Sequence, residues 1–317
     1  MSDVAAVKQL VSKYNALRTE ISKVIVGQDE VVEQVLLSIF SGGHALLIGV
    51  PGLAKTLLVN TVAQTLGLKF KRIQFTPDLM PSDILGSEIL DKDRNFKFIK
   101  GPIFANIILA DEINRTSPRT QSALLEAMNE NQVTIDTETF QLPAPFFIMA
   151  TQNPKEIQGT YFLPESQIDR FILSVTIGYP ETSIEKEIIG GQNENESFDQ
   201  INKVLDSQQV QDLQKSVDSV SAQDELIDYV HSIVLATRET DHFDIGASPR
   251  AGIQMMRAAR GYALVKGRDY VTPDDIQTIA PHVLAHRLTL KGSSNILGER
   301  SQVLSKIEDI LSSIPAP

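Results

Sequence analysis

The chain has 317 residues, 42% of them hydrophobic and 22% charged, so it is long enough for two domains and a substantial core. It contains no cysteine, which excludes disulfides and thiolate metal sites. The net charge of -11 argues against a bulk attraction to nucleic acid. The apolar runs are of strand length, and the N-terminal residues lack the continuous apolar core of a secretory signal. We therefore expect a cytoplasmic protein with no membrane span and no nucleic-acid partner.

Helical and strand patterns alternate through the first half of the chain. Apolar residues recur at helical spacing over residues 4–24, 30–40, 55–67 and 119–130. Short apolar or alternating runs, typical of strands, cover residues 44–49, 70–75, 106–112 and 146–153. Two further runs, 132–136 and 139–142, flank a polar turn and predict a hairpin. Strands that alternate with helices indicate a parallel sheet covered by helices on both faces.

The pattern changes after Pro180. No further strand is expected, and helices are predicted over residues 183–191, 209–217, 223–239, 249–267 and 273–288. The polar segment 190–200 is expected to form a surface loop. The sequence thus predicts an α/β domain, residues 1–180, followed by a smaller all-helical domain, residues 181–317.

The stretch GVPGLAKT, residues 49–56, nearly matches the phosphate-binding pattern G-x-x-x-x-G-K-S/T, with Ala54 in place of the second glycine. It lies between a predicted strand and a predicted helix, as such a loop requires. Lys55 would then reach the β- and γ-phosphates of a nucleotide, and the Thr56 hydroxyl would bind Mg²⁺. The alternative is a tight strand-to-helix turn with a chance Lys-Thr pair.

Two acids, Asp111 and Glu112, end the apolar run IILADE. At the carboxyl end of a buried strand, Asp111 can hold hydrated Mg²⁺, and Glu112 beside it can polarise an attacking water. The alternative is a pair of acids that solvate the end of a strand. The phosphate loop at the same predicted sheet edge favours the first interpretation, because ligands of such folds bind at that edge.

Three more polar residues follow. Asn153 lies just after a buried strand and could reach the γ-phosphate, although Asn-Pro is also an ordinary turn signal. Arg170 could complete a neighbouring subunit's site, or it could form a surface salt bridge with Asp169 or Glu165. Arg250 is predicted in the first turn of a helix, where a cation opposes the helix dipole; contact with a γ-phosphate would explain it.

In this order the motifs resemble those of the AAA+ ATPases, and closely those of the MoxR family. The resemblance covers almost the whole chain. It is carried by the stretches VGQ (26–28), GVPGLAKT (49–56), RIQFTPDLMPSDILG (72–86), GPIFANIILADEINR (101–115), QSALLEAMNE (121–130), ATQNP (150–154), LPESQIDRF (163–171) and GASPRA (246–251). It implies a P-loop AAA+ αβα sandwich with a helical lid. Alanine before the loop lysine is common in the family, and we expect Ala54 to begin the helix with a negative φ.

The resemblance also implies a role for each matching residue, with ATP and Mg²⁺ as cofactors. Catalytic roles fall to Glu112, to Asn153 as first sensor, to Arg170 as a finger acting in trans, and to Arg250 as second sensor in the lid. Arg115 is expected to face a neighbouring subunit. The nucleotide-binding residues are Val26 and Gly27 at the adenine, with Gly49, Pro51, Gly52, Leu53, Ala54, Lys55, Thr56, Leu57 and Asp111 around the phosphates.

MoxR-like ATPases form rings, usually hexamers, and act with partners that bear a von Willebrand factor A domain. The resemblance therefore implies a chaperone-like ATPase that matures protein complexes or inserts metal cofactors. Alternatives are the ATPase subunit of a magnesium or cobalt chelatase, a DNA motor, and a nucleotide-gated scaffold with little turnover. The acidic charge counts against the DNA motor, and Glu112, Asn153 and Arg170 together count against the scaffold.

Two other features have structural interpretations. His282 and His286 are spaced as metal ligands on a helix can be, but no nearby acid or third ligand is evident, so a packing or solvent role on a lid helix is favoured. The hairpin around Asp136–Thr139 could project into a ring pore or form a plain surface hairpin.

Overall fold

The core of the first half is a five-stranded parallel sheet in the computed structural model of the chain, which describes residues 2–90, 95–135, 138–153, 160–161, 163–190, 201–292 and 299–317. The strands are β1 (His44–Ile48), β2 (Phe70–Gln74), β5 (Ile107–Asp111), β8 (Phe147–Gln152) and β9 (Phe171–Thr176). Their order is β2-β5-β8-β1-β9, and every neighbouring pair is parallel. The predicted parallel sheet is confirmed, whereas β9 was missed by the sequence analysis.

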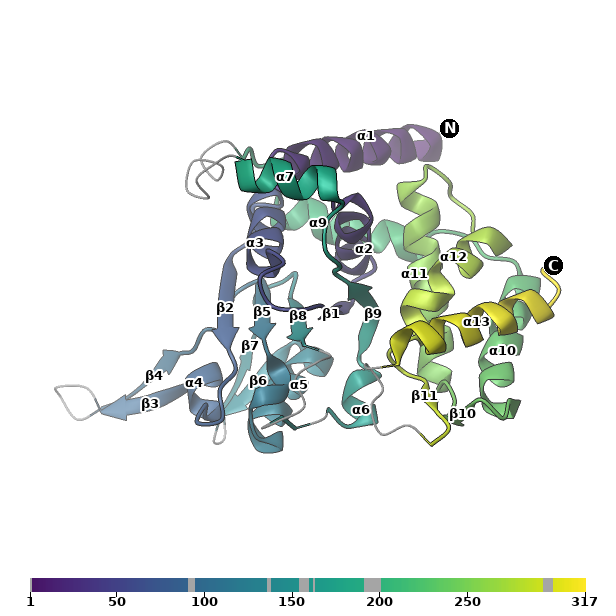
Figure 1. The fold of residues 1–317 in the computed structure, drawn as a ribbon. Helices are drawn as coiled ribbons and strands as arrows, with labels where there is room; N and C mark the ends of the chain where they lie inside the picture. The colour runs from purple at the N-terminus through teal and green to yellow at the C-terminus, as the bar shows by residue number, and fades with distance from the viewer. Residues whose placement is uncertain are drawn as a thin grey trace.

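Helices cover both faces of this sheet (Figure 1). Leu47, Leu109 and Met149 face one layer, which contains α1 (Ser2–Ser22), α2 (Asp29–Phe40) and α3 (Lys55–Thr65). Their strand neighbours Leu46, Ile108 and Ile148 face the other layer, with α4 (Pro81–Leu85) and α5 (Pro118–Glu130). Successive side chains of a strand point to opposite faces, so strands buried on both faces have the continuous apolar runs that the sequence shows.

Two hairpins extend from the α/β domain. The predicted one is confirmed as β6 (Gln132–Ile135) paired with β7 (Glu138–Gln141), although its turn at 136–137 lies outside the described residues. The other, β3 (Gly86–Leu90) with β4 (Phe96–Lys100), projects from the side of the domain near α4 (Figure 1) and was not predicted.

The second half is mainly helical, as expected. Its described helices are α7 (Thr182–Gly190), α9 (Ser207–Asp218), α10 (Asp224–Glu239), α11 (Pro249–Val265), α12 (Pro273–Leu284) and α13 (Arg300–Ser313). One expectation was wrong, because β10 (Phe243–Ile245) and β11 (Thr289–Leu290) form a small antiparallel sheet. Strands of three and two residues are too short to leave a periodic signal. The predicted loop at 190–200 lies almost wholly outside the described residues.

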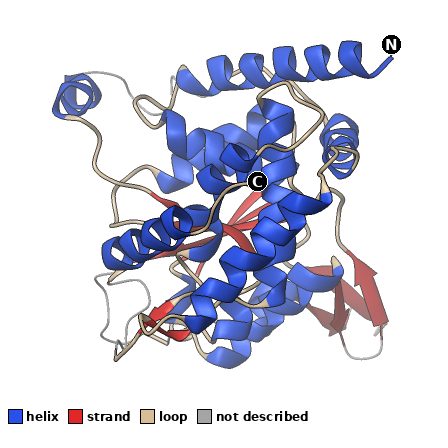
Figure 2. Cartoon of the chain, turned by 90° about the vertical axis from the view of Figure 1, so that its right-hand side faces the viewer, coloured by secondary structure: helices blue, strands red, loops and turns tan. Residues whose placement is uncertain are grey.

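The lid packs against the β9 edge of the parallel sheet. Ile172 and Leu173 of β9 and Leu37 of α2 share one hydrophobic cluster with α10, α11, α12 and α13. Figure 2 views the molecule from the lid side, with these helices in front of the sheet. Within the described residues, no helix has both the length and the apolar character that crossing a bilayer requires.

Candidate functional site

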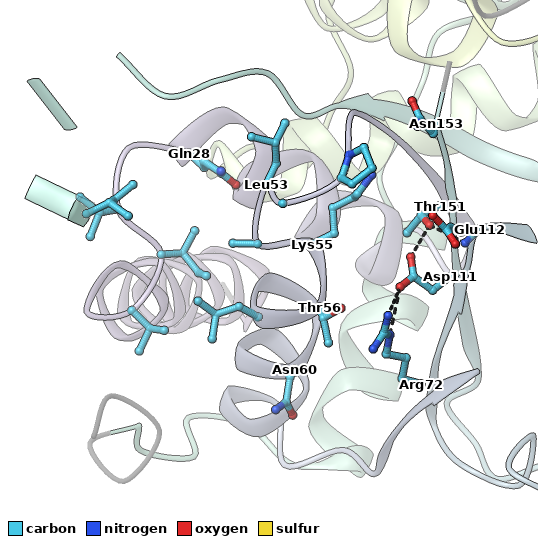
Figure 3. A pocket seen from close by; sticks show the side chains of 18 of the residues that line it. Gln28, Leu53, Lys55, Thr56, Asn60, Arg72, Asp111, Glu112, Thr151 and Asn153 are labelled. Carbon is cyan, nitrogen blue, oxygen red and sulfur yellow. Dashed lines mark hydrogen bonds and ion pairs between the residues drawn. The ribbon is translucent and has the colours of Figure 1, made fainter. Parts of the chain in front are cut away.

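A cavity of about 1360 Å³ opens at the carboxyl ends of β1, β5 and β8. The loop at residues 51–57 forms one wall, and the ends of β2, β5 and β8 form the opposite wall (Figure 3). The end of α1 and the segment that follows it, together with α7, line the remainder. In α/β folds of this kind ligands bind outside the carboxyl ends of the strands, and this cavity exceeds the size of an ordinary small-molecule site.

The phosphate loop connects β1 to α3, and the structure contradicts the expected geometry of Ala54. This residue has φ 53° and ψ 25°, which is the left-handed region and not the negative φ that we expected. The chain reverses sharply at the N-cap of α3, and alanine adopts that conformation at a cost of about 1–2 kcal/mol. Ala54 is therefore strained in the position where the standard motif has glycine.

Lys55 and Thr56 lie in the first turn of α3 and line the cavity. Lys55 Nζ donates a hydrogen bond to the carbonyl of Gly49, so the lysine side chain folds back onto the start of its own loop. Burial lowers the pKa of Lys55, and the Asp111 and Glu112 carboxylates oppose that shift. An anion placed beside this loop would meet a cation and the free N–H groups of a helix start.

Both oxygens of Asp111 are occupied. The Thr151 hydroxyl donates to Oδ1 at 2.6 Å. Arg72 donates to Oδ2 with Nε at 3.0 Å and Nη2 at 2.6 Å. Figure 3 shows Asp111 between Thr151 of β8 and Arg72 of β2. The register of the sheet brings these side chains together, because β5 lies between β2 and β8.

Glu112 has a left-handed backbone, φ 57°, where the chain leaves β5. Its N–H donates to the Thr151 hydroxyl at 2.8 Å. Its carboxylate accepts a hydrogen bond from Gln74 Nε2 at 2.7 Å and forms an ion pair with Arg115 at 3.2 Å. Arg115, which we expected to face a neighbouring subunit, therefore contacts Glu112 of its own chain. The carboxylate is held on the cavity wall without being buried.

The other end of the cavity is less charged. Val26 and Gln28 line it from the segment after α1, and Ile188 and Gly190 line it from α7. Gly27 does not line the cavity. It has φ 70° and lies so close to Ile184 of α7 that a Cβ atom would meet that side chain at 2.3 Å. Gly27 thus permits the close approach of α7 that completes this wall.

The remaining predicted residues are divided between two places. Asn153 lines the cavity, directly after β8. Gly49 does not line it but accepts the Lys55 hydrogen bond. Arg170 and Arg250 also lie outside the cavity. Arg170 donates to the carbonyl oxygens of Leu125 and Ser166.

The position of Arg170 follows from the sheet. Phe171 pairs with His44 at the start of β1, while the phosphate loop follows Ile48 at its end. Strand β9 has six residues. It rises about 3.3 Å per residue, so Arg170 lies roughly 20 Å from the level of the chain's own phosphate loop.

Arg250 lies near Arg170. The pKa of Arg170 is lowered mainly by its burial and, to a smaller extent, by the Arg250 cation. We expected Arg250 to reach the γ-phosphate of its own chain from the lid. The structure does not bring it there, because the lid packs on the β9 edge and places the start of α11 at the amino end of that strand.

Sequence reasoning missed several residues of the cavity wall. Three of them bond directly to the paired acids: Arg72 and Gln74 on β2, and Thr151 on β8. Their signal in the sequence is weak, although Arg72 and Gln74 are polar residues in a strand that ends at the predicted site. Pairing to a neighbouring strand is what gives them a role, and a single sequence does not show which strands are neighbours.

The two lid histidines pack as expected. His286 is buried and His282 is half-buried, and the loss of solvent lowers the pKa of His282 to about 4 and that of His286 well below its usual value. His286 Nε2 bonds to the carbonyl of Phe171, and His282 Nε2 to Gln34. Among the described residues, no group of three or more histidines, cysteines and acids could hold a metal ion.

Comparison with known proteins agrees with this geometry. A family model described as "ATPase family associated with various cellular activities (AAA)" matches residues 44–173, and one described as "AAA lid domain" matches residues 235–307. Chaperone MoxR1 of Mycobacterium tuberculosis is 46% identical over 86% of this chain and 74% of that protein. The uncharacterised protein YeaC of Bacillus subtilis is 44% identical over 94% of this chain and 92% of that protein.

A crystal structure of a protein from Cytophaga hutchinsonii has a TM-score of 0.89 at 40% identity, covering 100% of this chain and 98% of that one. The sheet, the phosphate loop and the lid together define a nucleotide-binding AAA+ ATPase. Within that class, the chain belongs to the MoxR family.

Proposed function

We propose that ATP hydrolysis occurs in the cavity between the phosphate loop and the paired acids. One observation carries the proposal: Lys55 and Thr56 lie on one wall of a single cavity, and Asp111 and Glu112 lie on the other (Figure 3). Lys55 would hold the β- and γ-phosphates, and the loop residues 51–57 would surround them. Val26, with Gly27 behind it, would form the adenine end. Bound ATP would supply the phosphoanhydride bond that water cleaves, and Mg²⁺ would neutralise charge on the phosphates.

Mg²⁺ fits the oxygen donors of this cavity. The Thr56 hydroxyl and the Asp111 carboxylate are the kind of ligand that Mg²⁺ takes, directly or through water. Arg72 occupies Oδ2 of Asp111, so the arginine and a hydrated cation would compete for the same carboxylate. Arg72 would thereby reduce the affinity for Mg²⁺ and hold Asp111 in place before nucleotide binds.

Glu112 is the best candidate for the group that accepts a proton from water. It follows Asp111 directly and its carboxylate lines the cavity. Gln74 and Arg115 both contact Oε2 of this carboxylate, so we expect Oε1 to be the oxygen that meets the water. Asn153, at the end of β8, would orient the water or the γ-phosphate.

The two arginines outside the cavity favour a ring. Arg170 and Arg250 lie together at the far end of β9, and Arg170 is roughly 20 Å from the level of its own loop. No described carboxylate lies within salt-bridge distance of either one. A head-to-tail neighbour could place its γ-phosphate against this pair, and heterologous contacts of that kind close into rings. We therefore assign both arginines, and not Arg170 alone, to the next subunit's nucleotide.

The wider role rests on the family. We propose a cytoplasmic ring of six copies that remodels or matures protein complexes, or inserts metal cofactors, with a partner that bears a von Willebrand factor A domain. The relative named Chaperone MoxR1 supports a protein client. We also propose a division near residue 180, with α7 and α9 bridging toward the nucleotide-binding domain.

A mixing experiment tests the proposed mechanism. Arg170→Ala and Glu112→Gln chains are each expected to be inactive, since a trans arginine is worth about 10³–10⁵ in rate. Co-assembled rings should recover part of the activity, because some interfaces combine an intact Glu112 with an intact Arg170. Lys55→Ala should abolish ATP binding and serves as the control. Mixed rings that bind ATP and remain inactive would show that Arg170 does not act in trans.

A further inference from the structure

Asp169, the residue before Arg170, connects the α/β domain to the lid through both carboxylate oxygens. Oδ1 accepts a hydrogen bond from Arg287 Nε at 2.8 Å. Oδ2 accepts one from the Ser248 hydroxyl at 2.8 Å. Arg287 follows α12, and Ser248 is the N-cap of α11. A single carboxylate of the first domain therefore binds two separate elements of the lid.

Arg287 fixes the backbone on each side of Arg170. Its Nη2 donates to the carbonyl of Asp169 at 3.3 Å and to that of Phe171 at 2.6 Å. Its side chain is only 3% exposed, and burial lowers its pKa to about 10, against the opposing effect of Asp169. Removing one partner of a buried ion pair leaves the other charge uncompensated, so Arg287 depends on Asp169.

The same carboxylate also fixes the start of α11. Ser248 Oγ donates to Asp169 and accepts from the N–H of Ala251, so the cap of the helix and the interdomain bond share one hydroxyl. Arg250 lies two residues beyond Ser248, in the first helical turn. Arg170 therefore follows Asp169 directly in the chain, and Arg250 lies two residues after Ser248, which is hydrogen-bonded to Asp169.

The two arginines need such a restraint because like charges repel. Burial and, as a smaller cause, the Arg250 cation lower the pKa of Arg170. Within the described part of the chain, the Arg170 guanidinium bonds to carbonyl oxygens only, those of Leu125 and Ser166. The hydrophobic cluster with β9 holds the lid as a whole, while the bonds to Asp169 set where the start of α11 lies relative to Arg170.

We propose that Asp169 is a positioning residue that holds Arg170 and Arg250 as one unit, aimed at the phosphates of the neighbouring subunit. The proposal rests on the proposed function, in which both arginines act in trans. Asp169 does not line the nucleotide cavity. It acts by fixing the lid against the α/β domain, so its loss misplaces the arginines and leaves the chain's own cavity intact.

The test uses the full chain carrying Asp169→Ala. The turnover number for ATP should fall about 10²-fold, the effect of a misplacement near 1 Å, while ATP affinity changes less than about twofold. Glu165→Gln, which alters an exposed carboxylate of the same segment, is the matched control and should leave both values unchanged. Asp169→Asn keeps the size of the side chain and serves for all measurements if the alanine variant does not fold.

Mixing distinguishes positioning in trans from a general structural defect. Asp169→Ala chains co-assembled with Glu112→Gln chains should regain activity, because the Glu112→Gln chain supplies an intact arginine pair to the neighbour's intact Glu112. The Arg170→Ala and Glu112→Gln mixture is measured alongside. If that mixture recovers and the Asp169 mixture does not, the inference is overturned and the ring mechanism stands. If neither recovers in rings shown to be mixed, the ring mechanism itself fails. A wild-type turnover number in Asp169→Ala also overturns the inference.

Discussion

Substituting Ala54 with glycine should stabilise this protein, although the same change in an ordinary helix destabilises. Ala54 is exposed and has φ 53°, a conformation that glycine adopts without steric cost. A matched control is Ala16→Gly. Ala16 is also exposed, but it lies within the right-handed helix α1. Neither substitution removes buried apolar surface, so the backbone conformation decides the sign.

The magnitudes follow from two opposing effects. Glycine at position 54 relieves about 1–2 kcal/mol of left-handed strain. It also raises the entropy of the unfolded chain, which costs about 0.4–1 kcal/mol. The net stabilisation is therefore about 0.8 kcal/mol, within a span of about 0–1.6 kcal/mol. In α1, Ala16→Gly has no strain to relieve and should destabilise by about 1 kcal/mol.

Urea denaturation without nucleotide measures both variants against the natural chain. Because the two domains can unfold separately, the transition should be followed by a probe in the α/β domain. The two midpoints should shift in opposite directions. If Ala54→Gly destabilises as much as Ala16→Gly, then Ala54 has a right-handed conformation and the strained-loop account is wrong.

Three further predictions concern charge and protonation. His44 is buried, and its Nδ1 accepts a hydrogen bond from the Ile148 N–H. Burial lowers its pKa from 6.5 to about 4. Between pH 6.5 and 4, the imidazole is therefore protonated in the unfolded chain and neutral in the folded chain. This one group should therefore lower the free energy of unfolding by about 3 kcal/mol as pH drops through that window. His282 and His286 add losses of the same sign, so His44→Gln should make the slope measured by urea titration less steep without abolishing it. Glu112→Gln should retain ATP binding, measured by equilibrium dialysis, while hydrolysis falls about 10²–10⁴-fold; wild-type turnover would assign the base to another residue. Arg72→Gln removes the arginine that competes with Mg²⁺ for Asp111, so it should lower the Mg²⁺ concentration for half-maximal ATP binding. The change should be about two- to fivefold, because the ion pair between Arg72 and Asp111 is partly exposed and therefore weak. An increase in that concentration would show that Arg72 assists binding of the cation.

The sequence predicted those parts of the molecule that depend on local pattern. The strands at His44–Ile48 and Ile107–Asp111 are continuous apolar runs because both of their faces are buried. The polar residues that follow such strands in a parallel sheet must meet at one edge. The positions of Lys55 and Asp111 in one cavity therefore followed from chain order, and the parallel sheet is confirmed.

The missed features depend on contacts distant in sequence. Strand β3 is exposed on both faces beyond Gly86, so it has no alternating pattern. Arg72 reaches Asp111 because β2 and β5 are neighbours, which chain order does not state. The position of Arg250 depends on how the lid docks on β9. The positive φ of Ala54 depends on the reversal of the loop, whereas alanine as a residue type favours a negative φ.

The central claim is that each site is completed by the next subunit. A structure of the Glu112→Gln ring with ATP and Mg²⁺ tests it most directly. The account predicts the Arg170 and Arg250 guanidinium groups of one subunit within about 3 Å of the γ-phosphate oxygens bound by its neighbour. The contrary result is a γ-phosphate contacted only by its own chain, with Arg170 still donating to the carbonyl of Leu125.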